Sequence, residues 1–453
     1  MRNALFLYAQ LLAALAVVLS VAVSGARAET GSGEDIVEVR TDSGIVAWLK
    51  QEPSIPMIAV SAMWRGAGAV ADPADKAGRA NLLAATLDEG AGDMDSQAFQ
   101  QRLDDHGIRL SFEAGRDSLN MTLQTLTENA GEAFGMAGLA LSEPRFDAEA
   151  LDRMRAQIQS SIARSLQNPN AIAGQAFSAL AFGDDRYSQP TDGTPETVAA
   201  LAAEDLRSHM ATTVGRENLI IGVVGDITPE ALKPLLETAF GKLPAIGGIP
   251  ELGEASFNAT GVEKYIDYEG PQTVLVFGTP GIVRTDPDFD AARVMNHILG
   301  GGGFSSLLTE EIREKRGLTY GVYSYLRPLD RGGAWLGGLS TSNEKAAEAL
   351  TVLKTTIAEY RDIGPDEEQL AKAKANINGA FPLRFASNSA IAELLVAIQR
   401  YDLGRDYMAR RPERIDAVTV DDIKRVANRI LNLDAMIVVG VGQPKGLRTT
   451  PTE

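Results

Sequence analysis

Residues 219–225 read LIIGVVG, and residues 436–442, which lie 217 positions later, read MIVVGVG. The stretches before them align at the same spacing without a gap, since residues 198–207 read VAALAAEDLR and residues 415–424 read IDAVTVDDIK. Such a repeat indicates that one helix-and-strand unit occurs twice. Strands grouped with helices, without a regular alternation of the two, are typical of an α+β fold. We therefore expect two similar α+β domains.

The length of 453 residues favours two or more domains, because a single core rarely grows so large. Residues 243–261 contain a stretch rich in glycine and proline that lacks periodicity, and we interpret them as a linker. The predicted domains are then residues 29–242 and 262–445, followed by a short tail over residues 446–453.

The first 28 residues have the features of a secretory signal: a basic start, an apolar core and the small-residue ending Ala26-Arg27-Ala28. We expect cleavage before Glu29, although the apolar run is nearly long enough to serve as an uncleaved membrane anchor. After cleavage we expect no membrane association and a periplasmic location.

The chain contains no cysteine, which excludes disulfides, a thiolate zinc site and a lipid attached to cysteine. With 43 Lys and Arg against 60 Asp and Glu, its formal charge is −17, and −19 after signal removal. Such a charge repels nucleic acid and anionic lipid, so neither is an expected partner. It attracts basic peptides, but it also serves simple solubility.

Alternation and helical periodicity predict the elements of the first domain. We expect a hairpin over residues 35–49, a strand over 57–64, helices over 96–106, 128–142 and 147–167, and paired strands over 109–113 and 118–126. The last helix is expected to end at Asn168-Pro169, because proline stops the helical pattern.

A further helix is expected over residues 78–90 (GRANLLAATLDEG), opening after Asp72-Pro73 and closing at a glycine. Positions four apart lie on one face of a helix, which is how a zinc site can place two imidazoles, with a carboxylate at the neighbouring position. In this helix those positions hold Asn81, Ala85 and, between them, Ala84.

The segment and the strand before it, residues 55–68, resemble the inverted zinc motif H-x-x-E-H of the insulinase/pitrilysin peptidases, including bacterial proteins similar to mitochondrial processing peptidase. The resemblance implies two α+β domains that face each other like a clam shell. It puts the first two zinc ligands at Asn81 and Ala85, the base at Ala84 and the third ligand at Ser161. Alanine donates nothing, and Asn81 and Ser161 offer only two weak neutral oxygens, so we expect no zinc on this chain.

The second domain carries residues 299–320 (LGGGGFSSLLTEEIREKRGLTY). We predict a helix that is capped by Ser305 or Ser306 and ends at Gly317. A strand is expected over residues 318–325, with Leu318, Tyr320, Val322 and Ser324 on one face. The four glycines lack the spacing and the lysine of a phosphate-binding loop, and we interpret them as a flexible loop beside the interior of the clam shell.

This segment is similar to the family's pair of an arginine and a tyrosine seven residues apart, here Arg313 and Tyr320. The resemblance implies that both reach toward a zinc-bound peptide. An arginine fork can hold peptide carbonyls, and a phenol can donate to the oxygen that becomes negative during hydrolysis. From the residues alone, Arg313 can equally be a cation that interacts favourably with the negative end of a helix dipole, and Tyr320 can be a half-buried strand residue.

Other candidate residues favour simpler interpretations. The three histidines, His106, His209 and His297, stand far apart without a second imidazole four positions on, so each is expected to be structural or exposed. Asp88 and Glu89 point in different directions from a helix and indicate a solvated helix end. Ser160 and Ser161 have no neighbouring base in the sequence that would activate a nucleophile.

Three functions remain. The first is a non-catalytic subunit of a heterodimeric periplasmic zinc metallopeptidase, which lends substrate-binding residues and half of a peptide chamber to a paralogous partner that holds the zinc. The second is a stand-alone peptide-binding or scaffold protein that keeps only the peptidase fold. The third, an independent hydrolase with relocated chemistry, is weakest, because histidine clusters and cysteines are missing.

Overall fold

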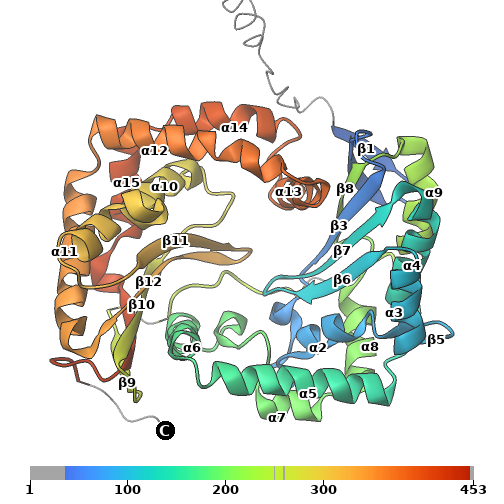
Figure 1. Cartoon of the computed structure of the whole chain (residues 1–453), viewed down its shortest axis with the longest axis horizontal. Helices are drawn as coiled ribbons and strands as arrows, with labels where there is room; N and C mark the ends of the chain where they lie inside the picture. The colour runs from blue at the N-terminus through green and yellow to red at the C-terminus, as the bar shows by residue number, and fades with distance from the viewer. Residues whose placement is uncertain (1–35, 249, 259–260, 449–453) are drawn as a thin grey trace, which may run out of the picture.

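The computed structural model describes residues 36–248, 250–258 and 261–448. Two halves of the chain face each other, and each half contains its own sheet with helices on the outer side (Figure 1). The sheet of the first half has the order β1-β2-β8-β3-β7-β6. Its strands are β1 (Ile36–Arg40), β2 (Val46–Gln51), β3 (Met57–Arg65), β6 (Arg109–Ala114), β7 (Ser118–Leu126) and β8 (Leu219–Gly225).

The sheet of the second half has the order β11-β12-β10-β13-β9. Its strands are β9 (Glu263–Asp267), β10 (Gln272–Pro280), β11 (Val322–Leu329), β12 (Gly332–Ser342) and β13 (Ile437–Gly442). The repeated segments form β8 and β13, and each pairs in parallel with one neighbour, β2 or β9, and antiparallel with the other, β3 or β10. Apart from the additional β1, the two sheets therefore share one topology, which confirms the predicted α+β fold of two similar domains.

Helices cover the outer faces in the same order along both halves. In the first half they are α2 (Arg79–Thr86), α3 (Ser96–Asp105), α4 (Ala130–Ser142), α5 (Ala148–Ser165), α7 (Pro195–Ala200), α8 (Ala203–Thr213) and α9 (Pro229–Phe240). In the second half they are α10 (Phe289–Asn296), α11 (Ala346–Ile363), α12 (Glu367–Gly379), α14 (Tyr407–Asp416) and α15 (Val420–Ile430). Chain order and sheet order make α10, α12 and α15 the counterparts of α2, α5 and α8.

Each half has its own apolar core between sheet and helices. Trp64 on β3 is fully buried against Phe240 in the first core, and Trp335 on β12 is fully buried against Phe277 in the second. Truncating a buried aromatic side chain of this size to alanine typically destabilises a fold by about 3–5 kcal/mol. The two cores are thus separate hydrophobic clusters, as two domains require.

One helix of each half packs on the sheet of the other half. Helix α6 (Pro169–Phe182) lies against β13 and β10, and α13 (Asn388–Arg400) lies against β8 and β3. Glycines in the sheets make room for them, since a Cβ at Gly222 would lie 2.4 Å from the carbonyl oxygen of Ala392. The exchanged helices lock the two halves together.

Helix α6 was not predicted, because Pro169 was interpreted only as the end of the preceding helix. In the structure α5 does end at Ser165, but Pro169 then occupies the first position of α6, where proline is favoured. The Asn168 side chain caps α6 by accepting a hydrogen bond from the backbone N–H of Asn170, at 2.9 Å.

Apart from the helix predicted over residues 78–90, the other predicted elements of the first domain are confirmed within two residues at their ends. The described part of the linker, residues 243–248, 250–258 and 261, contains neither helix nor strand. The predicted signal, residues 1–28, lies outside the described residues, and the exact domain limits stay a prediction. Among the described residues no single helix is long and apolar enough to cross a membrane, and one pair of helices passes that test only when joined across a bend of 116°.

Candidate functional site

Helix α2 begins at a tight turn that only glycine fits. Gly78 has φ +88°, and a Cβ there would lie 2.6 Å from the carbonyl oxygen of Asp192. The buried carboxylate of Asp72 accepts hydrogen bonds from the backbone N–H of Ala80 at 3.1 Å and from Nε of Arg79 at 3.3 Å. The first turn of α2 is therefore held by an acidic group at its positive end.

The helix is shorter than predicted. It ends at Thr86, whose hydroxyl donates to the carbonyl oxygen of Leu82 at 2.8 Å, and the chain then turns into the short strand β4 (Gly90–Ala91). The expected closure at Gly90 is wrong, because the chain leaves the helix before that glycine, which has φ +114° and pairs with Asp95 in a small hairpin.

The three motif positions all lie within α2, and α5, which carries Ser161, packs against α2. Asn81, Ala85 and Ser161 are partly exposed, whereas Ala84 is buried. The helix pair that would present two imidazoles and a carboxylate is thus present, with neutral or inert side chains on it.

These side chains do not fit a zinc ion. A catalytic zinc takes three strong protein ligands, usually imidazole nitrogens or carboxylate oxygens, and Asn81 and Ser161 provide only neutral amide and hydroxyl groups. Over the described ranges of the chain, no three His, Cys, Asp or Glu residues stand together as a metal site.

His209 has a structural role. His209 is fully buried on α8, and its Nε2 lies 2.9 Å from the carbonyl oxygen of Ala67, so that this nitrogen carries the proton and donates. Burial lowers the pKa of His209 to about 4, which keeps the ring neutral. Its Nδ1 lies 3.7 Å from the Asp72 carboxylate, which in turn supports α2. His209 is therefore a structural histidine behind the helix.

The remaining candidates near α2 are also structural. Glu89 accepts hydrogen bonds from Arg153 and from the hydroxyl of Ser96, and the backbone carbonyl of Asp88 accepts one from Gln100 at 2.9 Å. The Ser160 hydroxyl donates to a backbone carbonyl of its own helix at 2.8 Å. These contacts tie helix ends together and leave no activated nucleophile.

Arg313 and Tyr320 lie at the surface of the second half. The Arg313 guanidinium forms an ion pair with Glu314 at 2.9 Å and lies 4.8 Å from the centre of the Phe304 ring. Tyr320 is 89% exposed. The side chains are therefore accessible to a group outside this chain.

The strand predicted over residues 318–325 begins later than expected. After Gly317, which has φ +58°, residues 318–321 are irregular, and β11 runs from Val322 to Leu329. The Thr319 hydroxyl donates to the backbone carbonyl of Ser340 at 2.7 Å, so a side chain replaces the ladder bond there. Tyr320 consequently does not share the buried face of Leu318, Val322 and Ser324, and that part of the prediction is wrong.

The four glycines are not a flexible loop throughout. Gly300 and Gly301 belong to a wide helical turn, His297–Gly301, that continues α10. A Cβ at Gly300 would lie 2.3 Å from the hydroxyl oxygen of Ser324 on β11. At least this glycine is needed for close packing between helix and strand. Ser306, one of the two predicted caps, is buried, and its carbonyl accepts from the backbone N–H of Glu310 at 3.0 Å.

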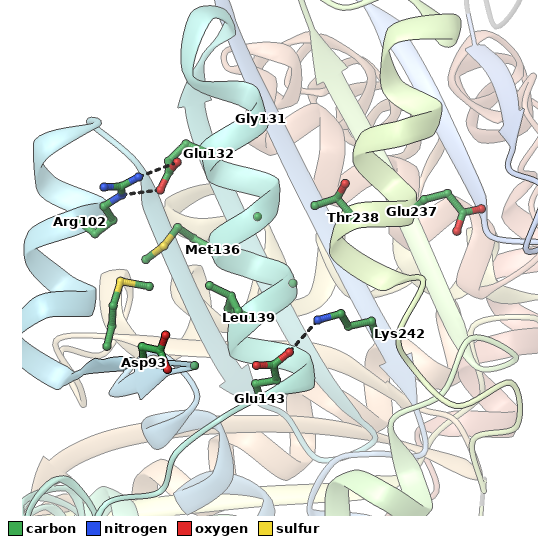
Figure 2. A pocket seen from close by; sticks show the side chains of 14 residues that line it. Asp93, Arg102, Gly131, Glu132, Met136, Leu139, Glu143, Glu237, Thr238 and Lys242 are labelled. Atoms are coloured by element: carbon green, nitrogen blue, oxygen red, sulfur yellow. Dashed lines mark hydrogen bonds and ion pairs between the residues drawn. The ribbon is translucent and has the colours of Figure 1, made fainter.

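A cavity of about 710 Å³ opens on the outer side of the first half, between α3, α4 and α9 (Figure 2). Four of its charged side chains form two ion pairs: Arg102 with Glu132 at 2.6 Å, and Lys242 with Glu143 at 2.7 Å. Asn81, Ala85 and Ser161 are not among its lining residues, so this cavity is separate from the motif helix.

Sequence reasoning missed a second cavity, of about 660 Å³, which is bounded by α10, β11, α12 and α14. Its lining includes Arg284, Arg293, Arg384 and Arg411. These residues come from four separate segments of the second half, so no local motif could have indicated that they meet.

Two sequence models of one peptidase family match the chain in order. The model described as "Insulinase (Peptidase family M16)" matches residues 49–195, and the one described as "Peptidase M16 inactive domain" matches residues 200–377. Together they span most of both structural halves.

Individual relatives agree with this assignment. A protein of Helicobacter pylori named "Non-peptidase homolog YmxG" is 26% identical over 77% of this chain and 79% of its own length. A mitochondrial-processing peptidase subunit beta from Lentinula edodes is 22% identical over 90% of each chain. The crystal structure of a peptidase M16 inactive domain from Pseudomonas fluorescens superposes with a TM-score of 0.85 and 28% identity, covering 92% of this chain and 100% of that one. The family resemblance is thereby confirmed: this chain belongs to the insulinase family of peptidases, M16, and carries the family's two-domain fold.

Proposed function

We propose that this chain is the non-catalytic subunit of a heterodimeric periplasmic zinc metallopeptidase. It supplies half of a peptide chamber, and the substrate-binding residues Arg313 and Tyr320, to a paralogous partner that holds the zinc. One observation carries the proposal: the helix pair α2 and α5 is kept, while Asn81, Ala84, Ala85 and Ser161 stand at the positions of ligands and base. A fold maintained without its ligands needs a function that does not depend on its own metal.

The names of two relatives support this role. One relative is called a non-peptidase homolog, and another is a subunit of a processing peptidase. We extend both descriptions to this chain as part of the proposal. The periplasmic location rests on the predicted signal over residues 1–28.

The accessible positions of Arg313 and Tyr320 suit residues that act on a bound peptide. Tyr320 is 89% exposed, and the ion pair and ring contact of Arg313 hold its guanidinium at the surface. A phenol so placed can donate to an oxyanion that develops at the partner's zinc.

The edge of the second sheet offers a surface for an extended peptide. β11 is an edge strand, and the rings of Tyr323 and Tyr325 stack on its exposed face with centroids 6.2 Å apart. Free backbone groups on an edge strand bind extended peptides by adding a strand, and aromatic rings provide contact area.

The experiment is co-expression with a paralogue that has an intact H-x-x-E-H motif, followed by an assay with a quenched fluorescent peptide. Only the pair should be active. Arg313→Ala and Tyr320→Phe should each lower kcat/KM by more than about tenfold, since losing one oxyanion donor typically costs about 10²–10³. Arg316→Ala is the matched control on the same helix end, and it should keep the rate within about twofold.

Full activity of the Arg313 and Tyr320 variants would remove their proposed role. If no pair forms and the chain purifies alone, the stand-alone binding or scaffold function replaces the subunit function. Peptidase activity of the isolated chain, unaffected by metal chelators, would instead point to an independent hydrolase.

A further inference from the structure

The cavity lined by arginines lies in the second half, at the place that corresponds to the helix pair α2 and α5 of the first half. α10, β11 and α12 bound it, and they are the counterparts of α2, β6 and α5 in the shared topology. Figure 1 shows α10, α12 and α14 in the upper part of the second half, with β11 below them. The duplication has therefore produced two similar places, one with degenerate zinc positions and one with a cluster of cations.

The lining of this cavity contains four arginines, and no aspartate or glutamate among the described residues. Arg411 is the most deeply placed, with 2% of its surface exposed, and its Nη1 has no hydrogen-bond partner within the described part of the chain. A buried guanidinium donor without an acceptor is costly, because it has lost its hydration. An anionic ligand would supply the missing acceptor.

The surrounding groups orient the arginines without neutralising them. The Arg411 guanidinium lies 4.0 Å from the centre of the Phe381 ring, and that of Arg284 lies 4.3 Å from the centre of the Phe289 ring. Arg284 also donates to the hydroxyl of Tyr407 at 2.8 Å. Stacked guanidinium groups keep their forks available for a carboxylate or a phosphate.

The carboxylate that interacts electrostatically with Arg411 is already engaged elsewhere. Asp290 on α10 accepts a hydrogen bond from Nε of Arg414 at 2.7 Å. Burial, followed by the positive charge of Arg411, lowers the pKa of Arg293 to about 10. The Arg293 guanidinium thus remains cationic at neutral pH, and an anion would relieve the repulsion among the arginines.

The volume of the cavity and its lining residues favour an organic anion over a bare phosphate. A volume of about 660 Å³ is within the range of pockets for organic ligands, and Phe289, Leu326, Pro328, Ile377 and Phe381 add apolar surface to it. A bare phosphate would leave most of that surface unused. We propose that this pocket binds an organic carboxylate with an apolar body, such as the free C-terminal end of a peptide, with Arg293, Arg384 and Arg411 holding the carboxylate. The proposal concerns the isolated chain and does not depend on a zinc-bearing partner.

Isothermal titration calorimetry on the purified chain tests this pocket with three probes. They are a short apolar peptide ending in phenylalanine with a free carboxylate, the same peptide with a C-terminal amide, and inorganic phosphate. The free acid should bind, and the amide should bind at least about tenfold more weakly, because hydrogen bonds to charged groups are the strong ones. Phosphate should bind more weakly than the free acid.

Arg293→Gln and Arg384→Gln should each weaken binding of the free acid by about tenfold or more. Arg384 is exposed, so its variant is expected to fold even if a buried one does not. Arg410→Gln is the matched control, since Arg410 lies beside Arg411 on α14 but is paired with Asp406 at the surface, at 3.0 Å. The affinity of the Arg410→Gln variant for the free acid should not change.

Equal binding of the acid and the amide would overturn the proposal, and so would unchanged binding in a folded Arg384→Gln variant. Binding of phosphate without binding of the free acid would also overturn it, because the site would then be specific for small oxyanions. None of these results depends on whether a peptidase partner exists.

Discussion

Arg331 and Asp185 join the two halves of the molecule through two hydrogen bonds, from Nη2 at 2.6 Å and from Nη1 at 2.9 Å. Arg331 follows β11 in the second half, whereas Asp185 follows the exchanged helix α6. The Arg331 guanidinium also lies 4.5 Å from the centre of the Tyr187 ring, and Tyr187 donates a hydrogen bond to Asp117 at 2.5 Å. This network therefore links side chains of both halves.

Arg331→Gln should therefore destabilise the chain by about 1–3 kcal/mol, because the partly buried Asp185 carboxylate loses a bidentate, charged hydrogen-bond partner. Urea unfolding measures the change. Arg40→Gln, which removes an exposed pair with Glu38, should change stability by less than about 1 kcal/mol. Equal effects of the two substitutions would mean that the network between the halves contributes little.

The exchanged helix α13 gives a second prediction. Gly222→Ala should destabilise the chain by about 1–3 kcal/mol, because the new Cβ would press on the backbone of Ala392. Gly131→Ala on α4 is the matched control: a Cβ there meets nothing within 4 Å, and alanine favours a helix. If both variants have the same unfolding midpoint in urea, the close approach of α13 to β8 does not limit stability.

The pair of Asp72 and His209 predicts how stability responds to acid. Burial raises the pKa of Asp72 to about 6 and lowers that of His209 to about 4. Between these values the unfolded chain binds a proton at His209, and the folded chain binds one at Asp72, so the two contributions to the pH dependence offset each other. Asp72→Asn removes only the contribution that gains stability as the pH falls.

The free energy of unfolding of Asp72→Asn should therefore drop more steeply than that of the wild type between pH 6 and pH 4, by about 1 kcal/mol per pH unit. Urea unfolding at several pH values gives the difference directly, and other titrating groups cancel in it. His209→Gln should show the opposite difference. Parallel curves for all three proteins would contradict the assigned protonation states.

Much of the fold could be predicted from the repeat, because β8 and β13, and the helices before them, repeat at a fixed spacing of 217 residues. The exchange of α6 and α13 could not be predicted. α6 begins at a proline that also suits a helix end, and its apolar surface does not say which sheet it covers. The start of β11 was missed: the strand was predicted from Leu318 but begins at Val322, and before it the Thr319 hydroxyl donates to the backbone carbonyl of Ser340.

Of the candidate sites, only the part that depends on local sequence spacing was predictable. The helix with Asn81 and Ala85 stands out because its spacing is local, and α5 brings Ser161 into the neighbouring helix. The pocket around Arg411 depends on contacts between residues 284–293 and the distant Arg384 and Arg411, and single arginines in a sequence look like ordinary surface residues. The exposure of Tyr320 could not be predicted from the sequence either, because it follows from the late start of β11.

A graft tests whether the helix pair keeps the geometry of a zinc site. The triple variant Asn81→His, Ala85→His and Ser161→Glu should bind about one zinc ion per chain, because it supplies three ligands of the required kind on α2 and α5. The double variant without Ala85→His should bind far more weakly. A folded triple variant without zinc, measured by metal analysis after dialysis, would mean that the helices have lost the required geometry.

The most direct measurement is the zinc content of the unmodified chain, purified without chelators and analysed by inductively coupled plasma mass spectrometry. With Asn81, Ala85 and Ser161 at the ligand positions, we predict far less than one zinc per chain, and no gain after incubation with zinc and dialysis. A tightly held zinc ion at one per chain would contradict the account.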